Sequence, residues 1–163
     1  LIMQGNKKVI DLLNKQLTLE LTSMDQYLAH SKMYEDWGIN KLHEKLAHEY
    51  EEELDHAKRL AERILFLEGK ADTASREKVN VGSNVKEMLE NDLKAEQVVA
   101  ESLRSIIAVC EQEKDYVSRE TLEALLDDTE MDHIYWIEQH LGLIDKIGLQ
   151  NYIQSQMNGG PAS

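Results

Sequence analysis

The stretch Glu53-Leu54-Asp55-His56 decides the architecture of this 163-residue chain, because its Glu-x-x-His spacing returns once more as Glu130-Met131-Asp132-His133. A spacing of three places both side chains on one face of a helix, one above the other, where they can bind a single ion. None of the other four histidines follows a glutamate by three residues. The two stretches therefore indicate two ion-binding pairs, each carried by a helix.

Each pair also follows a separate glutamate at nearly the same distance. Glu20 lies 33 residues before Glu53, and Glu96 lies 34 residues before Glu130. All four glutamates stand on helical stripes that are otherwise apolar and carry no lysine or arginine. Because a buried carboxylate is unfavourable unless it is paired or bound to metal, metal is the expected partner.

An acidic chain places some glutamates three residues before a histidine by accident. This chain has 31 acidic residues against 18 basic ones, so a single such pair would mean little. Two pairs, each on a core stripe and each with a matched upstream glutamate, favour a binding site over chance.

The composition narrows the classes of function. A net charge of −13 disfavours nucleic acid and anionic membranes as partners and favours cations, although it also helps to keep a helical bundle soluble. The single cysteine, Cys110, excludes an intrachain disulfide and is expected to be a buried structural thiol. With no secretory signal and no apolar run long enough to span a bilayer, we expect a cytoplasmic protein. Leu1 and Ile2 precede a methionine and are given no meaning.

Helical periodicity divides the chain into four long segments and one short one. The expected helices cover residues 6–37, 41–68, 85–112, 118–146 and 149–157. The aperiodic connection 69–84 spans roughly 50 Å when extended, whereas the preceding helix is about 42 Å long. The connection can therefore cross the whole bundle. The sequence predicts one all-α domain over residues 1–163, a four-helix bundle with a long crossover, a short fifth helix and a disordered tail over 158–163.

With these motifs in place, residues 3–157 resemble the bacterioferritins, which are ferritin-like proteins. Besides the two Glu-x-x-His motifs, the resemblance rests on the stretches Glu62–Gly69, Asp115–Arg119 and Gly148–Tyr152. It implies a hollow shell of 24 subunits that oxidises Fe(II) at an intrasubunit di-iron site with dioxygen or peroxide. It also implies storage of ferric mineral inside the shell.

Carried over by motif, the resemblance assigns a role to each candidate ligand. Glu20 and His56 would bind the first iron, Glu96 and His133 the second, and Glu53 and Glu130 would bridge the two. The same six residues would be the catalytic residues of a ferroxidase. Carboxylates with one imidazole per metal suit iron or manganese better than structural zinc, and each of two bridged metals can give one electron.

Five further positions are expected near the site or at subunit contacts. Tyr27 and Trp136 are either core aromatics or redox-active neighbours of the irons. His48 and Glu52 match the inner-surface iron site of the family, or else belong to a solvated helix face. Leu54 stands where haem-carrying members have their ligating methionine, so haem binding through that ligand is not expected.

Several functions and partners remain open at this point. Besides an iron-storage ferroxidase, the sequence is compatible with a rubrerythrin-like oxidase or peroxidase, or with a purely structural shell subunit. The missing cysteine-rich portion argues against the rubrerythrin-like enzyme, and the six intact ligands argue against the structural subunit. A DNA-protecting mini-ferritin fits poorly because its metal site lies between subunits. The shell is expected to contain this chain alone or to include a haem-binding sister subunit. A small bacterioferritin-associated ferredoxin is a further implied partner.

Overall fold

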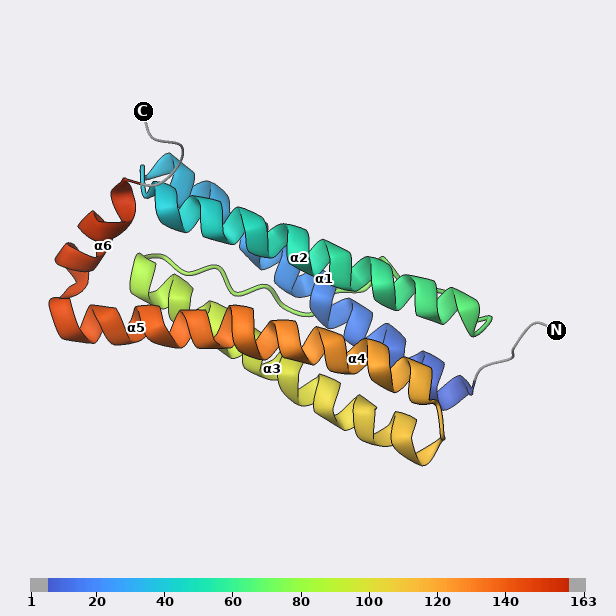
Figure 1. The fold of residues 1–163 in the computed structure, drawn as a ribbon. Coiled ribbons are helices and arrows are strands. Elements are labelled where there is room, and N and C mark those ends of the chain that lie inside the picture. Colours follow the sequence, from blue (N-terminus) through green and yellow to red (C-terminus); the bar gives the residue numbers. More distant parts are fainter. Residues whose placement is uncertain (1–5, 159–163) are drawn as a thin grey trace.

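Four long helical rods lie side by side, and a short helix crosses one end of the bundle (Figure 1). The computed structural model describes residues 6–158, so Leu1, Ile2 and all of the expected tail except Asn158 lie outside the described residues. The rods are α1 (Lys7–Asp36), α2 (Asn40–Phe66), α3 (Val85–Gln112), and a continuous rod made of α4 (Tyr116–Asp128), η1 (Thr129–Ile134) and α5 (Tyr135–Ile147); the short helix is α6 (Leu149–Met157). No described residue forms a strand, and the predicted all-α fold is confirmed.

Local side-chain bonds explain where the helices begin. The Asn84 side chain accepts a hydrogen bond from the Glu87 backbone at 3.0 Å, and the Glu87 carboxylate accepts one from Ser83 at 3.3 Å. These two bonds cap the start of α3. Asn40 is the first residue of α2, because Gly38 takes a left-handed φ of 76° and closes the turn before it.

The crossover is held along α1 by side chains on one face of that helix. These side chains accept hydrogen bonds from crossover backbone N–H groups, at Asn14 (from Asp72), Thr22 (from Glu77), Gln26 (from Asn80) and His30 (from Gly82), with distances of 2.8 to 3.1 Å. Their spacing of four or eight residues keeps them on one face. The crossover therefore runs the length of the bundle, and α3 lies parallel to α2 (Figure 1).

Two apolar clusters fill the core, one toward each end of the bundle. One contains Leu17, Leu60 and Leu103, and the other contains Leu46, Leu89 and Ile137, all of them buried. On every rod the predicted ligand stands between residues of the two clusters, as Glu96 does between Leu89 and Leu103. The ligands therefore occupy the middle of the bundle.

The fourth rod is not the continuous α-helix that the sequence predicts over 118–146. Residues Thr129–Ile134 form a π-helical segment, which falls on the second Glu-x-x-His motif. A π-turn holds more residues than the 3.6 of an α-turn, so a separation of three residues covers a smaller part of one turn. The side chains of Glu130 and His133 therefore point in different directions around the rod.

None of the described helices is long and apolar enough to cross a membrane.

Candidate metal centre

Five of the six predicted ligands meet at the centre of the bundle. Glu20 comes from α1, Glu53 and His56 from α2, Glu96 from α3 and His133 from η1, and none is more than 1% exposed. Their ligand atoms form two groups, Glu20–Glu53–His56 and Glu53–Glu96–His133, in each of which the atoms lie within 4.8 Å of one another. Because Glu53 belongs to both groups, the geometry fits two cations that share one carboxylate.

Four polar atoms of the cluster make no hydrogen bond within the protein. One oxygen of Glu20, both carboxylate oxygens of Glu53 and Nδ1 of His56 are buried without a hydrogen bond. His56 Nδ1 lies 3.7 Å from Glu20 Oε2 and 3.9 Å from Glu53 Oε2, which is too far for hydrogen bonds but suits atoms that surround an ion. Buried groups of this kind are unfavourable unless they are compensated, so the residues present fit a bound metal.

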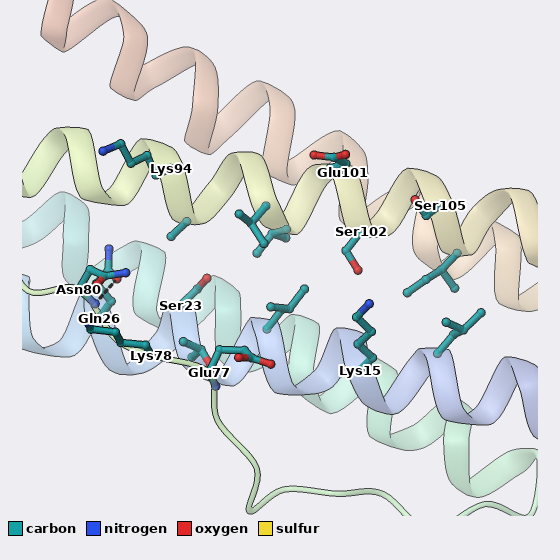
Figure 2. A pocket seen from close by; sticks show the side chains of 17 residues that line it. Lys15, Ser23, Gln26, Glu77, Lys78, Asn80, Lys94, Glu101, Ser102 and Ser105 are labelled. Carbon is teal, nitrogen blue, oxygen red and sulfur yellow. Dashed lines mark hydrogen bonds between the residues drawn. The ribbon is translucent and has the colours of Figure 1, made fainter.

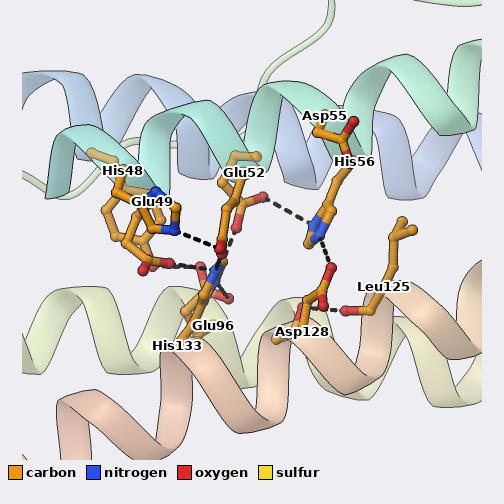
Figure 3. Close-up of polar contacts among 12 residues, drawn as sticks. His48, Glu49, Glu52, Asp55, His56, Glu96, Leu125, Asp128 and His133 are labelled. Carbon is orange, nitrogen blue, oxygen red and sulfur yellow. Dashed lines mark hydrogen bonds and ion pairs between the residues drawn. The ribbon is translucent and has the colours of Figure 1, made fainter. Parts of the chain in front are cut away.

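His56 is oriented by a carboxylate on the opposite side of its ring. Its Nε2 lies 2.9 Å from Asp128 Oδ2 of α4, while its Nδ1 faces the cluster (Figure 3). Metal-binding histidines commonly donate their other ring N–H to a carboxylate, which sets the tautomer and the direction of the ring. Asp128 therefore supports a ligand, and sequence reasoning missed it because it contacts His56 from a different helix.

His133 has the same arrangement. Its Nδ1 lies 3.2 Å from Glu53 Oε1 and 3.2 Å from Glu96 Oε2, while its Nε2 contacts Glu49 and lies 2.6 Å from Glu52 Oε2 (Figure 3). Glu49 is 3% exposed and was not predicted as a functional residue. Its position four residues before Glu53, on the same helix face, is the signal that would have identified it.

Glu130 does not join the cluster. Its side chain is 42% exposed and forms an ion pair with Arg104 of α3, at 2.7 Å between Oε1 and Nη2. The π-helical turn accounts for this, because it rotates Glu130 away from the face that His133 presents to the cluster. The structure thus contains one shared carboxylate where the sequence predicts two.

Burial and like charges change the acidity of the two carboxyl groups on the first metal position. Burial, reinforced by the negative charges of Glu20 and Glu96, raises the pKa of Glu53 well above its usual value. Burial also acts to raise the pKa of Glu20, but its interactions with Glu53 and His56 outweigh burial and lower it to about 2. Glu53 therefore keeps its proton to higher pH than an ordinary glutamate, whereas Glu20 is ionised at neutral pH.

The two histidines are also protonated in the absence of metal. Burial alone would lower the pKa of His56, but Glu20 and Asp128 outweigh it and raise the pKa to about 9. Burial is likewise outweighed at His133, where the charge of Glu96 and contacts with Glu49 and Glu52 raise the pKa well above 6.5. Protons thus supply the positive charge that cations would bring.

Comparison with known proteins agrees with this geometry. A model of the ferritin-like domain matches residues 10–147, which is most of the chain. The chain belongs to the ferritin-like family. It is 56% identical to the bacterial ferritin of Pseudomonas aeruginosa over 155 residues, covering 95% of this chain and 100% of that protein. Identity is 51% with the bacterial ferritin of Synechocystis (96% and 100% covered) and 40% with the bacterioferritin of Brucella melitensis (98% of each).

The chain is thus a bacterioferritin-type member of the ferritin-like family, and this membership supports a role in iron storage. Leu54, at the position where the sequence resemblance places a haem ligand in other members, is partly buried on α2 and offers only a hydrocarbon side chain.

In this ferritin-like protein, Glu52 belongs to the predicted inner-surface pair with His48 and also contacts the cluster. Glu52 Oε1 lies 2.8 Å from His48 Nε2, and its other oxygen lies 2.6 Å from His133 (Figure 3). The hydrogen bond from His133 is the main cause that lowers the pKa of Glu52 to about 2. The His48 side chain is 62% exposed, so the pair leads from the buried cluster to the surface.

The two predicted aromatic neighbours lie next to the second metal position. The Tyr27 hydroxyl donates a hydrogen bond to Glu96 Oε1 at 2.5 Å and packs edge-on against His133, with ring centroids 6.2 Å apart. Trp136 lines a small cavity together with Tyr27, Glu49 and His133. Tyr27 therefore orients a ligand.

A much more open cavity lies elsewhere. It is a groove of about 640 Å³ between α1 and α3, bordered by Lys15, Ser23, Glu77, Lys94 and Ser102 (Figure 2). None of the five cluster residues lines it. The metal centre is identified by its donor atoms and not by open volume.

Proposed function

We propose that this protein oxidises Fe(II) to Fe(III) at the buried cluster with dioxygen or peroxide, and stores ferric mineral inside a shell of 24 copies. The observation that carries the proposal is Glu53, a buried carboxylate whose oxygens accept no hydrogen bond and which belongs to two of the three groups of carboxylates with a histidine. Such a ligand holds two irons together, so that an oxidant meets both of them at once.

Each side chain has a defined task in this proposal. Glu20 and His56 bind the first Fe(II), Glu96 and His133 bind the second, and Glu53 bridges them. Both histidines bind through Nδ1, while carboxylates on the far side of each ring hold the Nε2 proton. Iron is the substrate, and each Fe(II) supplies one electron, so the pair matches the two-electron reduction of dioxygen to peroxide.

Glu130 completes the site by changing its rotamer when metal arrives. Its present partner, Arg104, is 57% exposed, and ion pairs at such exposed positions contribute only about 0–1 kcal/mol. Breaking that pair costs little compared with the attraction of two divalent cations. The proposed second bridge is therefore accessible from the observed structure.

The pair His48 and Glu52 provides the next binding position on the way to the inner surface. Glu52 already contacts both the ligand His133 and the exposed His48. Oxidised iron that leaves the second metal position meets this pair first.

Exposed apolar side chains at both ends of the bundle support assembly. Leu65, Phe66 and Val117 are each more than half exposed at one end, and Leu149 and Met157 of α6 are 37% and 45% exposed at the other. Such surfaces are commonly covered by neighbouring subunits. A haem-binding sister subunit and a small ferredoxin are proposed further partners, and a cytoplasmic location stays a prediction.

Stopped-flow absorbance tests the oxidation. Wild-type protein should oxidise about two Fe(II) per subunit in a fast phase, and Glu53→Ala and Glu130→Ala should abolish or greatly slow that phase. Glu138→Ala, which removes an exposed glutamate of α5, is the matched control and should keep it. Unchanged fast oxidation in Glu53→Ala would refute the site assignment. Failure to retain ferric mineral after oxidation would instead favour a di-iron oxidase or peroxidase without storage.

A further inference from the structure

A line of contacting side chains leads from α6 to the metal centre. It begins at Tyr152, the one buried residue among those of α6, all of which the structure describes. The Tyr152 hydroxyl lies 2.6 Å from Nδ1 of His140 on α5, and the two rings are nearly perpendicular. Because the rest of α6 is largely exposed, this buried contact is its main attachment to the bundle.

The direction of the first hydrogen bond follows from the environment of His140. Burial and then the positive charge of Lys45 lower the pKa of His140 to about 4, so the ring is neutral at physiological pH. Burial raises the pKa of Tyr152, which keeps its hydroxyl protonated. Tyr152 therefore donates, and Nδ1 of the neutral ring accepts.

The line continues through an aromatic stack to a lysine of α2. The His140 ring stacks on Trp136 with centroids 3.9 Å apart and an angle of 27° between the planes. The ammonium group of Lys45 lies 5.2 Å from the centre of the Trp136 ring, within the range of a cation–π interaction. Movement of α6 would therefore change the surface on which Lys45 rests.

The last two contacts reach a metal ligand. Lys45 Nζ lies 2.7 Å from Glu49 Oε1, and the other oxygen of Glu49 contacts Nε2 of His133. Glu49 is almost fully buried, and a buried carboxylate depends on its charged partners for its position. Since a lysine stem is flexible, the place of the ammonium is determined by the groups that hold it, here Trp136 and Glu49 together.

We propose that Tyr152 and His140 are positioning residues for the metal centre. Through their hydrogen bond, docked α6 holds Trp136 and Lys45 in place, and Lys45 in turn holds Glu49 against His133. This inference rests on the proposed function and deepens it. A subunit whose α6 is undocked binds the second cation less tightly, so oxidation is favoured in subunits whose α6 is held in the assembled shell.

Binding of Co²⁺ under anaerobic conditions tests the proposal without iron oxidation. The variant Tyr152→Phe removes one hydroxyl and keeps the ring. We expect it to weaken binding of one of the two Co²⁺ ions by about 2- to 30-fold, as measured by calorimetry and by the visible absorption of bound Co²⁺. Tyr135→Phe removes the hydroxyl of an exposed tyrosine on α5 and should bind both ions as the wild type does.

Two further variants show whether the effect passes through Glu49. Glu49→Gln should weaken the same ion by about 10- to 100-fold, and adding Tyr152→Phe to it should cause no further loss, because the path is already broken. If Tyr152→Phe does not assemble, Lys45→Met, which removes the ammonium and leaves α6 untouched, should reproduce the weaker binding.

Wild-type Co²⁺ affinity in Tyr152→Phe, or in Lys45→Met, would overturn the proposal. So would a double variant, Glu49→Gln with Tyr152→Phe, whose loss of affinity is the product of the two single losses. A different result would refute the proposed function: wild-type protein that binds two Co²⁺ but does not oxidise Fe(II).

Discussion

Loading the centre with two divalent cations should release at least about one proton per subunit near neutral pH. One proton comes from His56, whose pKa is raised to about 9, and the raised pKa values of Glu53 and His133 add to the release. A carboxylate or imidazole must lose its proton before it binds a metal.

The magnitude can be stated as a pH dependence. His56, with a pKa of about 9, is about 99% protonated at pH 7. The logarithm of the overall affinity for two cations should therefore rise by at least about one per pH unit around pH 7. The slope should become smaller toward pH 9, where His56 is protonated in only about half of the molecules. Affinity increases with pH because protons compete with the cations for the same atoms.

The metal-free protein should show the opposite trend in stability. A pKa that folding raises from 6.5 to about 9 contributes stability that is fully present below pH 6.5 and is lost as the pH rises through 9. The raised pKa values of Glu53 and His133 act with the same sign. The bundle without metal should thus be less stable at pH 9 than at pH 6.

The assay is stopped-flow mixing with Zn²⁺ in weak buffer containing a pH indicator, calibrated per subunit. His56→Gln should release one proton fewer, and Glu138→Gln, at an exposed position, should leave the count unchanged. Release of less than about one proton per subunit at full occupancy, or an affinity independent of pH between 6 and 8, would refute the reasoning.

Three other perturbations test assembly, haem binding and the core. Deletion from Gln150 onward should impair the shell because it removes α6; light scattering that shows shells of unchanged size would contradict this. Protein purified alone in haem-replete conditions should lack near-stoichiometric haem in the Soret region, and Leu54→Met should raise the haem content; no rise would mean that the pocket lacks more than its ligand. Leu103→Ala, at a fully buried position, should lower the free energy of unfolding by about 2–5 kcal/mol, and a loss below about 1 kcal/mol in thermal or denaturant unfolding would count against tight packing there.

The sequence by itself determined the helices, their order and most of the cluster. Apolar periodicity located every helix end to within two residues, because helix formation depends on neighbours three and four positions away. The length of the 69–84 connection was enough to predict a crossover. Glu20, Glu53 and Glu96 could be selected because each interrupts an apolar stripe that has to face the core, and His56 because it follows Glu53 by three residues.

Only the tertiary structure decided which side chains meet across helices. Asp128 supports His56 through a contact between helices that no local spacing encodes, and the spacing of Glu49 from Glu53 indicates its helix face but not its contact with His133. The connection from α6 to the centre depends in the same way on packing between α2, α5 and α6.

Glu130 shows the limit of spacing within a single helix. The Glu-x-x-His pattern implies a shared face only if the backbone keeps α-helical hydrogen bonds. The π-helical segment Thr129–Ile134 widens the turn, and it turns Glu130 outward to Arg104 while His133 stays inside. The sequence motif alone does not reveal this change from α-helical to π-helical hydrogen bonding.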